Sequence, residues 1–104
     1  MLPHEREILK RTVEGLLALP GVTGLHVDDG GEDDALHNCS DFDQIYEACD
    51  AVDDCRLYVT RCGHPTSFVW FIWGNGNDGL DCICDYGVSL EPVMGPISDW
   101  INEQ

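Results

Sequence analysis

The stretch CRLYVTRCGHPTSFVWFIWGNGNDGLDCICDY, residues 55–86, decides the fold. It contains three short runs rich in β-branched and aromatic residues: CRLYVTRC, SFVWFIW and DCICDY. A turn at residues 63–65 separates the first two runs, and a loop rich in glycine and asparagine separates the last two. Because short connections join neighbouring strands, the stretch predicts three consecutive antiparallel strands.

The flanking segments favour helices. Apolar residues recur at helical spacing after Pro3, which suits a first helical turn. A second helix follows Ser40, a suitable N-cap, and carries apolar residues on one face and acids on the other. A third helix is expected either to begin near Glu91 with a kink at Pro96 or to begin at Pro96 itself.

Between the first two helices, residues 22–27 favour a short strand, and a weak return strand near Ala35 is compatible with the pattern. The expected order of elements is α-β-α-β-β-β-α. We therefore expect one α+β domain spanning residues 1–104, with helices packed on one face of an antiparallel sheet of about four strands.

The aromatic strand over residues 67–73 is apolar on both faces. One face should meet the helices. The other needs a cover, either the first helix packed on the far side or another chain. The second alternative makes Trp70 and Trp73 candidates for an interface with a partner or with a second copy in a homodimer.

Charge is the most unusual property of the chain. Twenty acids against five Lys and Arg give a formal net charge of -15, and residues 28–54 hold eleven carboxylates with no Lys or Arg. Such a field repels nucleic acid and anionic membranes and attracts cationic proteins. We expect no direct binding to DNA, RNA or membrane. The candidate partner-binding acids are Asp28, Asp29, Glu32, Asp33, Asp34, Asp43, Glu47, Asp50, Asp53 and Asp54.

Two interpretations of these acids remain open. Charge runs are usually solvated surfaces, and a net charge of about 2 to 8 keeps a small domain soluble. The negative charge of this chain exceeds that range, and the excess destabilises the compact state by self-repulsion. An excess with such a cost favours the interpretation that the acids bind a cationic target. Carboxylates spaced along a helix and a turn would then imitate a line of phosphates.

No metal or cofactor is expected. The turn DDGGEDD, residues 28–34, and the loop NGNDGLD, residues 75–81, lack the glycine at the sixth position that a calcium loop of the EF-hand type needs. A zinc site can be drawn from Cys62, His64, Cys82 and Cys84, but its spacing differs from that of zinc knuckles. The simpler expectation places Cys82, Cys84 and Tyr86 in the core beneath the helices.

The sequence also lacks the motifs that are typical of enzyme active sites. No segment resembles a nucleophile elbow, an oxyanion loop or a phosphate-binding glycine pattern before a helix. The first 20 residues mix acids with bases, unlike a secretory signal, and no window of about 18 apolar residues is present. We expect a non-enzymatic, soluble cytoplasmic protein with mostly reduced cysteines, although the six cysteines would allow fifteen full disulfide pairings in an oxidising compartment.

The block FVWFIWGNGNDGLDCICDYGVSLEPVMGPISDWI, residues 68–101, resembles a pattern of small acidic proteins encoded by bacteriophages and prophages, and the turn DDGGE, residues 28–32, is similar to theirs. The resemblance implies a location in the cytoplasm of a bacterial host. Small acidic phage proteins are often inhibitors of host defence, including anti-CRISPR and anti-restriction proteins that mimic DNA.

Two hypotheses follow. The first is an inhibitor whose acids in residues 28–54 bind a basic, nucleic-acid-binding host protein. The second is an interaction or immunity-type protein that dimerises or docks through its aromatic strand, with the acids serving only solubility.

Overall fold

The computed structural model describes residues 1–31, 33, 35–61, 63–74 and 80–104. The fold is α+β, as expected, with five strands instead of about four, because the return strand near Ala35 is formed. In chain order the elements are α1 (Pro3–Leu17), β1 (Leu25–Asp28), β2 (Leu36–Cys39), α2 (Phe42–Asp50), β3 (Asp54–Val59), β4 (Ser67–Ile72), β5 (Ile83–Tyr86), the short 3-10 helix η1 (Val88–Leu90) and α3 (Glu91–Asn102).

The strands form one antiparallel sheet in the order β2-β1-β3-β4-β5. The centre is the hairpin of β3 and β4, whose register runs from Asp54 opposite Ile72 to Val59 opposite Ser67. The predicted antiparallel arrangement of the three runs in residues 55–86 is therefore confirmed.

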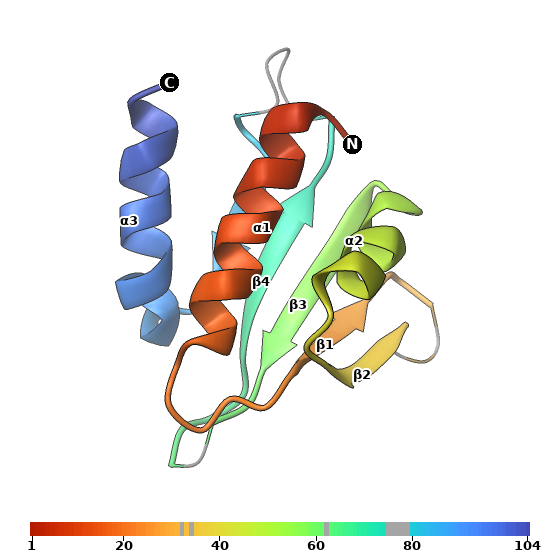
Figure 1. Cartoon of the computed structure of the whole chain (residues 1–104), viewed down its shortest axis with the longest axis vertical. Coiled ribbons are helices and arrows are strands. Elements are labelled where there is room, and N and C mark those ends of the chain that lie inside the picture. The colour runs from red at the N-terminus through yellow and green to blue at the C-terminus, as the bar shows by residue number, and fades with distance from the viewer. Residues whose placement is uncertain (32, 34, 62, 75–79) are drawn as a thin grey trace.

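All three helices lie on one face of the sheet (Figure 1). Helix α1 passes in front of the central strands, and it contacts α2 on one side and α3 on the other. The strands alternate accordingly: Leu57, Val69 and Phe71 are buried beneath the helices, whereas Tyr58 and Trp70 are partly exposed on the opposite face. The first helix therefore does not cover the far face of β4.

The helix boundaries follow local chemistry. The N-cap of α2 is Asp41, one residue after the expected Ser40, and its side chain accepts a hydrogen bond of 3.0 Å from the backbone N–H of Asp43. Helix α3 begins at Glu91, and Pro96 lies inside it. Of the two starts considered for this helix, the earlier one is correct.

A buried carboxylate joins α1 to the end of β4. Glu5 is 1% exposed. One carboxylate oxygen accepts the N–H of Leu2 at 2.8 Å, and the other accepts the N–H of Gly74 at 2.6 Å. Burial of this charge is tolerated because both oxygens are hydrogen-bonded.

Candidate functional site

The clearest acidic feature is a stripe on α2 formed by Asp43, Glu47 and Asp50, which we call the α2 stripe. All three side chains are exposed. Their spacing of four and then three residues places them on one face of the helix, about 6 Å and about 4.5 Å apart along its axis. One strand of B-DNA carries a phosphate every 3.4 Å or so along its axis. The stripe therefore carries about two thirds of the axial charge density of one DNA strand.

The α2 stripe is not arranged to stabilise its own helix. Asp43 lies in the first turn, where a carboxylate favours the helix dipole, but Asp50 lies in the last turn, where it opposes the dipole. The amino group of Met1 lies 2.9 Å from Asp50, and this hydrogen bond raises the pKa of the amino group. Asp43 and Glu47 face solvent.

The acids of the β1–β2 turn serve a local purpose. Asp28 accepts the N–H of Gly30 at 2.8 Å, and Asp29 accepts the N–H of Gly31 at 3.1 Å, so each carboxylate organises the turn that follows it. Asp33 is exposed. The two remaining acids of this candidate set, Glu32 and Asp34, lie outside the described residues.

The candidate acids do not form one line. Asp28 and Asp54 project from β1 and β3 on the sheet face opposite the helices, as the alternating burial of both strands shows. Asp54 accepts a 2.6 Å hydrogen bond from the indole N–H of Trp70. Asp53 is exposed just before β3. The acids thus divide between the helical face, the β1–β2 turn and the open sheet face.

Several arginines are held against aromatic rings of the same chain. Arg11 also pairs with Glu7 at 3.0 Å. The guanidinium carbon of Arg6 lies 5.4 Å from the ring centroid of Phe42 and 5.2 Å from that of Tyr46. The guanidinium carbon of Arg11 lies 4.1 Å from the ring centroid of Trp100, and that of Arg56 lies 4.6 Å from the ring centroid of Trp70.

The two tryptophans of the aromatic strand have different environments. Trp73 is 8% exposed, its ring stacks on Phe71 at 4.8 Å, and its indole N–H donates to the carbonyl of Cys49 at 2.9 Å. It is a core residue and cannot present its ring to a partner, so the expectation for Trp73 is wrong. Trp70 lies on the open face.

Two buried cysteines, Cys55 and Cys82, have raised thiol pKa values. Cys49 and Cys55 are buried. The pKa of the Cys55 thiol is raised mainly by a hydrogen bond with the Cys49 thiol and secondly by burial. Burial, and then the charge of Glu5, raises the pKa of Cys82 to about 12. Cys84 was expected in the core but is exposed, because an irregularity in the β4–β5 register turns it outward.

The metal sites considered from the sequence are only partly described. Cys62 and residues 75–79 of the NGNDGLD loop lie outside the described residues. Within the rest of the chain, no group of three or more His, Cys, Asp or Glu is placed to hold a metal ion.

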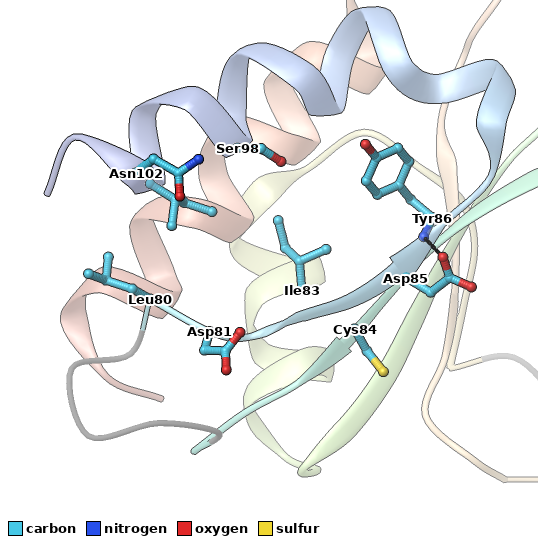
Figure 2. Close-up of a pocket in the computed structure, with 9 residues that line it drawn as sticks. Leu80, Asp81, Ile83, Cys84, Asp85, Tyr86, Ser98 and Asn102 are labelled. Atoms are coloured by element: carbon cyan, nitrogen blue, oxygen red, sulfur yellow. Dashed lines mark hydrogen bonds between the residues drawn. The ribbon is translucent and has the colours of Figure 1, made fainter.

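An open groove of about 270 Å³ lies between β5 and α3. Ile83 and Tyr86 point toward α3, and Cys84 and Asp85 point away from it (Figure 2). The hydroxyl of Tyr86 donates a 2.5 Å hydrogen bond to Glu91, which raises the pKa of Tyr86. Asp85 accepts the backbone N–H of Tyr86 at 2.8 Å. These polar groups are bound to one another instead of converging on the groove.

No helix within the described ranges is long and apolar enough to span a membrane. The chain matches no protein-family model, no curated protein and no solved structure.

Proposed function

We propose that this chain is a non-enzymatic inhibitor that imitates DNA and binds a basic, nucleic-acid-binding protein of a bacterial host. A CRISPR effector or a restriction enzyme has the required kind of groove, in which Lys and Arg side chains receive phosphates. The observation that carries the proposal is the α2 stripe, three exposed carboxylates on one side of a short helix, of which Asp50 also pairs with the amino group of Met1.

The stripe presents carboxylates in a line, as a DNA strand presents phosphates, at a wider axial spacing. The long, flexible Lys and Arg side chains of a partner can pair with successive carboxylates on α2. Individual exposed ion pairs contribute at most about 1 kcal/mol, so several must act together. The net charge of -15 adds long-range attraction, which accelerates encounter with a cationic surface.

Local helix stability does not account for Glu47 and Asp50, although Asp50 also pairs with the amino group of Met1. Neighbouring like charges one turn apart weaken a helix, and a carboxylate in the last turn opposes the helix dipole. Asp53 and Asp54 add two more negative charges beyond that same end. Acids in positions that disfavour the helix are consistent with a role in binding.

The test is a comparison of two variants that remove the same number of charges. The first combines Asp43→Asn, Glu47→Gln and Asp50→Asn. The matched control combines Glu14→Gln, Asp99→Asn and Glu103→Gln, three exposed acids on the other two helices and the chain end.

Each immobilised protein is exposed to bacterial lysate and eluted with a salt gradient and then with excess duplex DNA. We expect the original chain and the control to retain a nucleic-acid-binding protein that both salt and DNA release, and the α2 variant to lose it. Equal loss in both variants would mean that net charge alone is responsible. Retention that resists salt and DNA would contradict mimicry.

A further inference from the structure

The face of the sheet opposite the helices carries a row of aromatic side chains. Register places His26 opposite Tyr58 and Tyr58 opposite Phe68, so the three side chains lie side by side across β1, β3 and β4. Each is partly buried by its neighbours. His37 of β2 extends the row, with its ring centroid 5.7 Å from that of His26.

The next row on this face is charged at both ends. Register places Asp28 opposite Arg56, Arg56 opposite Trp70, and Trp70 opposite Asp85. Asp85 and Cys84 point away from α3, on the side of the open face (Figure 2). The row therefore carries a carboxylate at each end, with the guanidinium of Arg56 and the ring of Trp70 between them.

The face already contains one example of the contact it favours. The guanidinium carbon of Arg56 lies 4.6 Å from the centroid of the Trp70 ring, and Asp54 holds the indole N–H of that ring at 2.6 Å. The carboxylate fixes the orientation of the indole. The ring then offers its π face to a cation.

We propose that this open face binds an amphipathic basic segment of another protein. Apolar side chains of the segment pack on Tyr58 and Phe68, and an arginine of the segment replaces Arg56 over Trp70, close to Asp28 and Asp85. The proposal concerns a different surface from the α2 stripe and does not depend on it.

Two other occupants fit less well. Aromatic platforms on open sheets also stack the bases of single-stranded nucleic acid, but those platforms lie in basic grooves. Here the row next to the aromatic one ends in Asp28 and Asp85. A second copy would bring another net charge of -15 and would place carboxylates against carboxylates. Charge complementarity selects a cationic polypeptide.

The probes are two blocked octapeptides, one of alternating arginine and leucine and one of alternating arginine and serine. Binding is followed by NMR at physiological salt through the indole N–H signal of Trp70 and the backbone amides. We expect the leucine peptide to shift signals of Trp70, β3 and β4 and to bind more tightly than the serine peptide, which carries the same charge.

Substitutions then identify the contacts. Trp70→Ala should lower the affinity for the leucine peptide about fivefold. Trp70→Phe, which keeps an aromatic ring, should lower that affinity less. Arg56→Gln should strengthen binding about two- to fivefold by removing the internal competitor. Lys10→Gln changes the net charge equally at an exposed site on α1 and should leave binding nearly unchanged.

Several results would overturn the inference. The first is that the peptide shifts only the NMR signals of α2. The second is that Trp70→Ala keeps a native amide spectrum and binds the leucine peptide with unchanged affinity. The third is that Arg56→Gln and Lys10→Gln strengthen binding of the peptide equally. Shifts of Trp70 caused by oligothymidine, or a dimer that Trp70→Ala dissociates, would assign the face to one of the other two occupants. In the α2 triple variant, the leucine peptide should still shift the NMR signal of Trp70. The two proposals can therefore fail separately.

Discussion

Replacing Glu47 by glutamine should make the protein more stable while weakening its binding to a basic partner. Glu47 lies one turn from Asp43 and one turn from Asp50, and all three side chains are exposed on α2. Each like-charge neighbour at this spacing costs about 0.2–0.5 kcal/mol. Removing both repulsions should raise the free energy of unfolding by about 0.4–1 kcal/mol. For a domain of this size the gain corresponds to about 2–5 °C in Tm.

The matched control is Glu7→Gln, which should change stability in the opposite direction. Glu7 pairs with Arg11 one turn later on α1, at 3.0 Å, with side chains 41% and 42% exposed. Because solvent screens such an exposed pair, its loss should cost only about 0.3–0.5 kcal/mol.

Both effects are measured by urea unfolding, first at low ionic strength and then in concentrated sodium chloride. The Debye length falls to about 3 Å at 1 M salt, so the gain and the loss should both shrink toward zero. A loss of stability in Glu47→Gln at low salt, or a gain that persists at high salt, would refute the view that the α2 stripe is maintained against the stability of the fold.

Three further predictions concern the core and the thiols. Trp73→Ala should lower the free energy of unfolding by about 3–5 kcal/mol in urea titrations, since the buried ring leaves a cavity. Gly15→Ala should cost about 1–3 kcal/mol, because a Cβ there would lie 2.7 Å from Val93. Adding Val93→Ala should restore part of that loss, and a purely additive double variant would contradict the contact. Titration with a chromogenic thiol reagent at pH 8 should count one fewer fast-reacting thiol in Cys84→Ser than in the original chain. Cys82→Ser should give the same count as the original chain. The Cys82 pKa of about 12 leaves roughly one thiolate in 10,000 at that pH.

The central strands could be predicted because their local pattern and their tertiary role agree. The runs in residues 55–86 are rich in residues that suit a pleated, half-buried surface, and they form β3, β4 and β5. Strand β2 was a weaker expectation because the segment Leu36–Cys39 has no alternation of apolar and polar residues. It forms through pairing with β1, and Asn38 adopts a positive φ of 48° within it.

The candidate surfaces were predicted less completely, because exposure can be inferred from residue type whereas the face on which a side chain lies depends on packing. Trp70 and Trp73 are three residues apart in an extended segment, so they must point to opposite faces, and the sequence contained that signal. The outward turn of Cys84 had no such signal, since it arises from the irregular pairing of β5 with β4. The division of the acids between two faces likewise depends on how α2 packs over the sheet.

Both edges of the sheet discourage further strand addition. At one edge, β2 is four residues long and contains Asn38 in a left-handed conformation. At the other, β5 is equally short, its pairing is irregular, and Asp85 already binds the N–H of Tyr86. An approaching strand would find few unpaired backbone donors in register and would meet a carboxylate. The short, irregular edges therefore oppose the joining of copies edge to edge into fibrils, although one face of the sheet is aromatic.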